Sequence, residues 1–128
     1  MEEKLIEFET AKIAKTRGFN VVCENYFSEH LTGVIQENNQ SGFRNWNKEY
    51  ENSFSRPTQS LLQKWLREIH SLDVEPEKYQ HNEDGRYYKC RVWGEEFENE
   101  GYVTGFDSYE DALEEGLLCA LAAIKIKN

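Results

Sequence analysis

The sequence predicts an α+β fold, in which a small antiparallel sheet carries helices packed on one face. Its length of 128 residues suits one domain with one hydrophobic core, and we expect residues 1–128 to form a single domain. Seventeen aromatic residues supply large buried areas and argue against disorder despite the many charges. The C-terminal half follows the order helix, strand, strand, strand, helix.

Three helices are predicted by apolar residues that recur at helical spacing. The first covers residues 3–17 and ends before Gly18, a typical helix stop. The second covers residues 58–70 and has one broad apolar face. The third covers residues 108–125, with Ser108 as its N-cap and acids in its first turns. This last helix is apolar on several sides, so we expect it to be central to the core.

Strands are predicted at residues 72–79, 86–93 and from 96 or 97 to 104. Pro76 cannot donate a backbone hydrogen bond, so the first of them should be an edge strand or a short one. Closer to the N-terminus the pattern is weaker. A hairpin with strands at 31–36 and 43–47 is the best interpretation there, because residues 38–42 carry turn chemistry.

Neither export nor membrane insertion is predicted. The chain starts with the charged residues 1–4, and its longest uncharged apolar stretch, residues 116–124, is too short to cross a bilayer. We therefore expect a soluble, cytoplasmic protein. The widely spaced Cys23, Cys90 and Cys119 predict buried, reduced thiols, and no Cys/His cluster has metal spacing, so no cofactor is expected.

Charge is strongly segregated along the chain. The formal net charge is −9, and residues 95–115 contain nine acids and no Lys or Arg, whereas the rest of the chain is neutral. Such a patch can steer a basic partner, although it can equally be a solvated face that maintains solubility. A divalent cation held by its first acids is a weaker alternative, because the spacing matches no calcium loop. The predicted binding residues are Glu95, Glu96, Glu98, Glu100, Glu110, Asp111, Glu114 and Glu115.

The leading hypothesis for function is a non-catalytic module that binds a basic protein through this acidic surface. The alternative is a small enzyme that uses His30, His70 or His81 as acid-base groups near the Asn-rich segment or the sheet loops. No phosphate loop, serine elbow or zinc-helix motif surrounds these histidines. The Asn-rich segment itself, with Trp46 and Tyr50, could be a binding loop or a loop pinned to the core by its aromatics.

The predicted strand at 86–93 alternates aromatic and basic residues on one face, as in surfaces that stack single-stranded bases or contact another subunit. The order helix, three strands, helix also occurs in double-stranded-RNA-binding domains. Acids stand where such a domain would need bases, so we expect no direct binding of nucleic-acid phosphates. We expect a homodimer through the apolar girdle of Leu117, Leu118, Leu121 and Ala122.

One 14-residue block carries a resemblance to a known family. The block is Pro57-Thr58-Gln59-Ser60-Leu61-Leu62-Gln63-Lys64-Trp65-Leu66-Arg67-Glu68-Ile69-His70. It resembles the signature of a family of small uncharacterised proteins from gut-bacterial genomes and prophage-like regions. Residues 8–15, 18–19 and 109–117 are similar to the start and the end of that family. The resemblance implies a phage or mobile-element context, and no activity, cofactor or catalytic residue.

Overall fold

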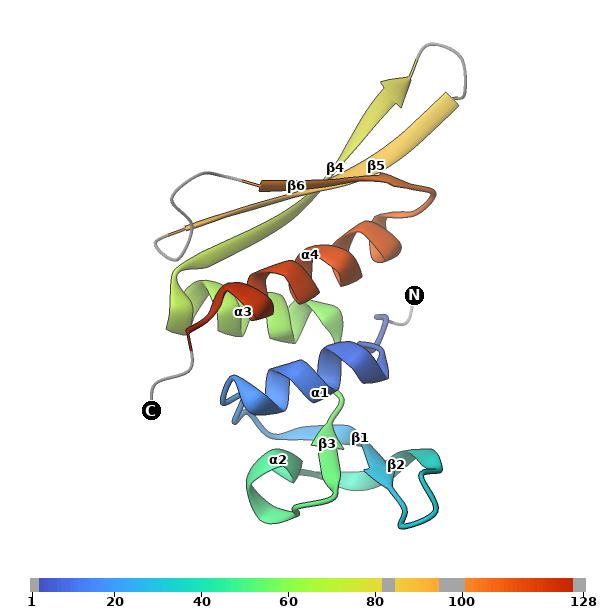
Figure 1. Ribbon diagram of the computed structural model, residues 1–128, viewed down its shortest axis with the longest axis vertical. Helices are drawn as coiled ribbons and strands as arrows, with labels where there is room; N and C mark the ends of the chain where they lie inside the picture. Colours follow the sequence, from blue (N-terminus) through green and yellow to red (C-terminus); the bar gives the residue numbers. More distant parts are fainter. Residues whose placement is uncertain (1–2, 82–84, 95–100, 126–128) are drawn as a thin grey trace. The chain divides into compact units, whose positions relative to one another are not determined.

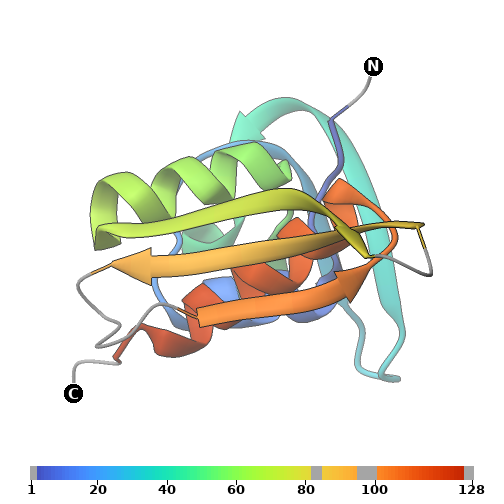
Figure 2. The ribbon, with the colours of Figure 1, turned by 90° about the horizontal axis from the view of Figure 1, so that it is seen from above.

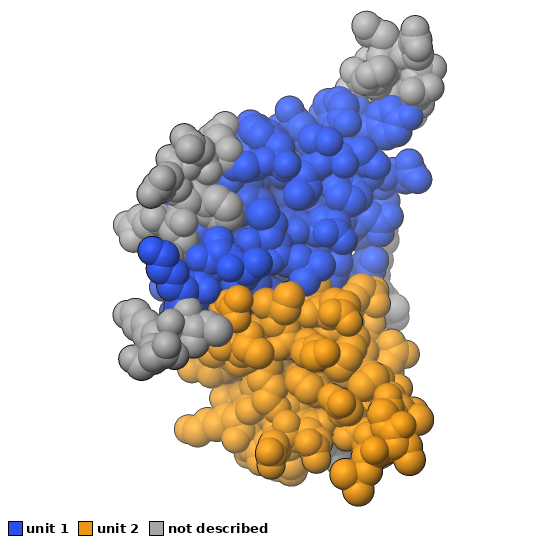
Figure 3. Space-filling view, viewed as in Figure 1, with its two compact units in different colours: residues 1–4, 59–128 blue, residues 5–58 orange. Residues whose placement is uncertain are grey.

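The computed structural model describes residues 3–81, 85–94 and 101–125. Over these residues the chain has the predicted α+β architecture, with four helices and two three-stranded antiparallel sheets. It divides into two compact units, and Figure 3 colours them separately. Unit 1 comprises residues 1–4 and 59–128, and unit 2 comprises residues 5–58. Each unit has its own sheet. That the two units together form a single domain remains a prediction.

Unit 1 has the predicted order of elements. It consists of α3 (Gln59–His70), β4 (Leu72–His81), β5 (Gly85–Gly94), β6 (Gly101–Phe106) and α4 (Tyr109–Ala123). The strands pair in the order β4-β5-β6, and both helices lie on the same side of that sheet (Figure 1). The prediction of helices on one face of a small antiparallel sheet is therefore confirmed.

The core of unit 1 lies between α4 and the sheet. Gly116 of α4 comes so close to the sheet that a Cβ placed there would overlap the sulfur of Cys90 and lie 2.9 Å from Cγ1 of Val74. Pro76 lies in β4, which is an edge strand of the sheet as the sequence predicted. The largest fully buried apolar residues of this unit are Leu62, Leu66, Leu72, Val74, Cys90, Val92, Leu117 and Leu121.

Unit 2 is built from α1 (Phe8–Thr16), β1 (Cys23–Glu29), β2 (Ile35–Arg44), α2 (Trp46–Glu49) and β3 (Ser53–Ser55). The central strand is β1, which pairs antiparallel with β2 on one side and β3 on the other. A cluster of aromatic rings fastens α1 to this sheet, because the ring of Phe8 meets those of Phe27 and Phe54 edge to face at 5.3 and 5.4 Å between centroids.

The predicted hairpin was wrong in its strands and in its turn, because residues 35–44 form one strand that pairs with β1, and α2 begins at Trp46. The observed turn consists of residues 30–34, where Gly33 adopts a φ of +84° and its amide donates to the carbonyl oxygen of His30. Residues 38–42, predicted to be the turn, lie in β2. Asn38 and Asn39 are paired with Tyr26 and Asn25 of β1, a strand that the polar sequence of residues 23–29 did not reveal, and residues 40–42 lie where the register shifts.

The first helix is also shorter than predicted. It begins at Phe8 instead of Glu3, because the chain before it is extended and Leu5 forms a bridge with Thr58. The amide of Ile6 donates to the carbonyl oxygen of Pro57 at 3.1 Å. The predicted stop is correct: Gly18 has a φ of +91°, and the amide of Phe19 returns to the carbonyl oxygen of Ala14. In the part of the chain that the structure describes, every helix is too short or too polar to cross a membrane.

Candidate functional site

The acidic start of α4 is the part of the predicted binding surface that the structure describes. The Ser108 hydroxyl accepts a hydrogen bond of 3.1 Å from the amide of Asp111, which confirms Ser108 as the N-cap. Glu110, Asp111 and Glu115 are exposed, and so is Asp107 just before the helix. The carboxylate of Asp111 lies 3.7 Å from the ammonium group of Lys4. Such an exposed ion pair contributes little to the stability of the fold.

Glu114 does not belong to this exposed surface, although the sequence placed it there. Its side chain is only 7% exposed, and one carboxylate oxygen accepts a hydrogen bond of 3.0 Å from Nε2 of the buried Gln59. The same Gln59 amide donates to the carbonyl oxygen of Glu110 at 2.9 Å. Glu114 therefore joins α4 to α3 inside unit 1. The other four predicted binding residues, Glu95, Glu96, Glu98 and Glu100, lie outside the described residues.

A hollow of about 360 Å³ lies between the N-terminal turns of α3 and α4. Polar groups on its wall bind one another: the hydroxyl of Ser60 donates to a carboxylate oxygen of Glu3 at 2.8 Å. Its lining comprises Glu3, Lys4, Gln59, Ser60, Gln63, Tyr109, Glu110 and Leu113.

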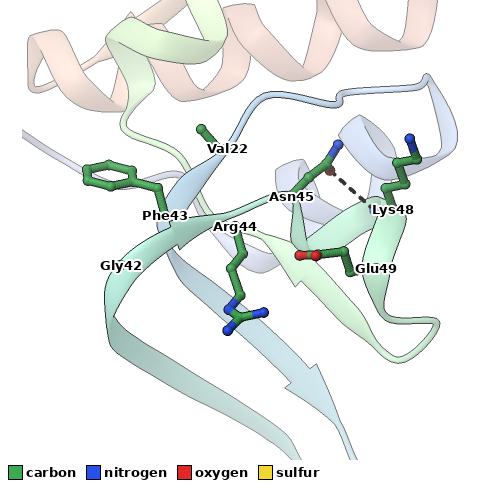
Figure 4. A pocket seen from close by; sticks show the side chains of 7 residues that line it. All are labelled: Val22, Gly42, Phe43, Arg44, Asn45, Lys48 and Glu49. Carbon is green, nitrogen blue, oxygen red and sulfur yellow. Dashed lines mark hydrogen bonds between the residues drawn. The ribbon is translucent and has the colours of Figure 1, made fainter.

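A second hollow, of about 700 Å³, lies in unit 2 where β2 runs into α2 (Figure 4). Two apolar side chains at its rim are unusually exposed: Phe43 is 66% and Val22 is 50% exposed. Arg44 and Lys48 add positive charge, and Glu49 adds a negative one. The Asn-rich segment, which the sequence offered as a possible binding loop, contributes Asn45 and Lys48 to this hollow, whereas Phe43 and Arg44 were not singled out.

The three histidines are divided between the two units. His30 is in the turn of unit 2, where its Nε2 lies 2.8 Å from Oε1 of Gln36. His70 ends α3 in unit 1 and packs edge to face on Trp65, with 4.7 Å between ring centroids. The side chain of His81 lies outside the described part. Neither His30 nor His70 lines the hollows described above.

The Asn-rich segment is pinned to its unit by specific contacts. Trp46 is buried, stacks on Tyr26 with 3.8 Å between ring centroids, and donates from Nε1 to the carbonyl oxygen of Cys23 at 2.8 Å. The side chain of Asn45 caps α2, and that of Asn47 accepts from the amide of Ser55 at 2.9 Å. These amides therefore complete the backbone hydrogen bonding of a loop.

The apolar girdle predicted as a dimer contact is mainly core. Leu117 and Leu121 are fully buried within this chain, Leu118 is half-buried, and Ala122 is exposed. The first two are consequently occupied by the fold itself and present no surface to a second subunit.

The three cysteines are free, and the predicted burial holds for Cys23 and Cys90, whereas Cys119 is only partly buried. Burial raises the pKa of the Cys90 thiol from 9.0 to about 12, and the negative charges of a Cys119 thiolate, Glu77 and Glu75 act in the same direction. Burial also raises the pKa of Cys23 and of Cys119. Since the thiolate is the reactive form, none of the three is primed as a nucleophile.

The raised pKa of Cys90 predicts a loss of stability in alkali. In the unfolded chain this thiol releases its proton near pH 9, whereas in the folded chain it keeps the proton up to about pH 12. The contribution is fully present below pH 9 and is lost as the pH rises from 9 to 12. We expect the free energy of unfolding to fall across this window, and the fall to be smaller in Cys90→Ala. Denaturant titrations at several pH values measure both, and equal slopes in the two proteins would contradict the prediction.

Comparisons with protein-family models, with curated proteins and with solved structures give no match. Among residues 3–81, 85–94 and 101–125, no group of three or more His, Cys, Asp or Glu side chains is placed to hold a metal ion. The structure therefore defines the fold class, and a function has to be inferred from the geometry of the candidate surfaces.

Proposed function

We propose that this chain is a non-catalytic protein-interaction module that binds a basic protein through the exposed acids at the start of α4. One observation carries the proposal: Asp107, Glu110, Asp111 and Glu115 are all exposed, in a 95–115 segment that contains no Lys or Arg. The phage or mobile-element context is part of the same proposal, and it rests on the sequence resemblance alone.

Helix stability does not account for all of these acids. Glu110 and Asp111 are in the first turn of α4, where the helix dipole favours negative charge. Asp107 precedes the helix, and Glu115 lies beyond the first turn, where that effect has faded. A uniform negative field would raise the association rate with a basic partner and repel an acidic one. The enzyme hypothesis has less support, because the described contacts of His30 and His70 are structural ones.

A charge-reversal variant tests this proposal. We expect Glu110→Lys, Asp111→Lys and Glu115→Lys together to reduce capture of a basic protein from host lysate by about tenfold or more, since like charges then face each other. The capture should also weaken at ~0.5 M salt, where screening is strong. Glu114 is left unchanged because it is buried. Mass spectrometry and quantitative binding to the purified partner measure the effect.

The matched control carries Glu7→Lys, Glu9→Lys and Glu68→Lys, which make the same change in net charge at exposed positions elsewhere. Glu9 is in the first turn of α1, so the control also contains a reversal against a helix dipole. Equal capture by both variants, or no basic partner at either salt concentration, would overturn the proposal.

A further inference from the structure

The β4–β5–β6 sheet of unit 1 has one face that points away from α4, and we call it the outer face. Val74, Cys90 and Val92 point toward α4 and are buried. The residues that alternate with them in β4 and β5 therefore point to the opposite side. Figure 2 looks onto this outer face, with α3 and α4 behind the strands. The side chains used below are Glu75, Glu77, Lys89, Arg91, Trp93 and Tyr102.

The outer face has the composition of a protein–protein interface, and its side chains contact one another before any partner binds. The guanidinium carbon of Arg91 lies 4.0 Å from the ring centroid of Trp93, and Nζ of Lys89 lies 4.9 Å from that of Tyr102. Aromatic residues and Arg are enriched at protein interfaces and dominate their binding energy. Side chains that already hold one another lose less conformational entropy when a partner arrives. Tyr102 remains 46% exposed, which is a large area for an aromatic ring.

Four charges on the outer face form two rungs, and Asp73 of β4, which alternates with Val74 and stands opposite Trp93, is a fifth charge with no base across from it. The strand register places Glu75 opposite Arg91 and Glu77 opposite Lys89, so the acids stand on β4 and the bases on β5. The ammonium group of Lys89 is 3.6 Å from the carboxylate of Glu77. Each rung is neutral. A strongly basic or strongly acidic partner would therefore meet one favourable and one unfavourable row.

A second copy of this chain matches both rows. Consider a two-fold axis that lies in front of the outer face and runs parallel to the strands, midway between β4 and β5. Rotation about this axis would place β4 of each copy over β5 of the other. Because each acid stands directly opposite a base in the register, Glu75 would then lie over Arg91 of the second copy, and Glu77 over Lys89. Sheets pack face to face with nearly aligned strands, which this axis produces. A two-fold contact requires such a self-complementary patch.

We propose that the chain forms a two-fold homodimer through the outer face of the β4–β5–β6 sheet. The rungs set the register of the two sheets, and the aromatic rings beside them provide the buried area. This contact replaces the dimer contact predicted at Leu117 and Leu121, which are core residues. It is independent of the acidic surface at the start of α4.

Charge reversal and charge exchange test the homodimer. We expect sedimentation equilibrium of the full chain to show a monomer–dimer equilibrium, and Arg91→Glu to raise its dissociation constant by about tenfold or more, since like charges then face each other. Glu75→Arg should have the same effect. The double variant with Glu75→Arg and Arg91→Glu exchanges the charges within the rung, so it should restore dimerisation to near the parent value. Circular dichroism of each variant checks its folding.

Arg67→Glu is the matched control: it makes the same charge change at an exposed position of α3 and should dimerise like the parent. If Arg91→Glu does not fold, Glu75→Arg carries the same test, because Glu75 is exposed. A parent chain that stays monomeric up to about 1 mM, a concentration at which even weak complexes form, would overturn the proposal. So would a dimer that persists unchanged in both single variants, or a double variant that is not restored.

Discussion

Gly116→Ala is expected to destabilise unit 1 by about 2 kcal/mol, because it overpacks the closest approach between helix and sheet. The new Cβ would overlap the sulfur of Cys90 and lie 2.9 Å from Cγ1 of Val74. Helix propensity acts in the opposite direction, since Ala is better than Gly inside a helix by about 1 kcal/mol. The clash should prevail, because Cys90 and Val74 are both almost fully buried and have little room to move. The free energy of unfolding from a denaturant titration measures the result.

A double variant shows whether the overlap with Cys90 is the cause. In Cys90→Ala with Gly116→Ala the sulfur is absent, so the two changes should be less harmful together than the sum of their separate effects, by about 1 kcal/mol. Gly101→Ala is the control in the same sheet, since a Cβ there meets nothing within 4 Å. Additive effects would mean that the sheet moves away as a whole and that Cys90 is not the obstacle.

Trp46→Ala is expected to cost unit 2 about 3–5 kcal/mol, as is usual when a large buried aromatic residue is truncated. The change removes the stack on Tyr26 and the hydrogen bond from Nε1 to the carbonyl oxygen of Cys23. Trp46→Phe keeps an aromatic ring and loses only the hydrogen bond, so it should cost about 1–3 kcal/mol. The order of the two effects follows from burial, because Trp46 is 3% exposed.

The same variant tests the prediction of a single domain. Two-dimensional amide NMR spectra of Trp46→Ala would show whether the signals of residues 59–125 keep their native positions when those of residues 5–58 collapse. If both sets collapse together, the chain unfolds as one cooperative domain. If only the native signals of residues 5–58 are lost, the two units fold separately and the single-domain prediction is wrong. Unchanged spectra and unchanged stability would contradict the role assigned to Trp46.

Local signals were sufficient for unit 1. Helix α3 carries one broad apolar face, α4 is apolar on several sides and begins at the cap Ser108, and Pro76 marks an edge strand. The strands of this sheet follow one another along the chain, so their pairing requires no long-range information. The alternation along β5 also separated the buried Cys90 and Val92 from the side chains of the outer face.

The sequence by itself therefore determined the fold class, the order of elements in unit 1 and the concentration of acids at residues 95–115. Only the tertiary structure decided that Glu114 is buried against Gln59, because helical spacing does not tell which polar residue faces a neighbouring helix. It also decided the sheet of unit 2. There β1 lies between β2 and β3 with a polar, irregular sequence. Its pairing with β3 joins residues distant in the chain, such as Phe27 opposite Phe54.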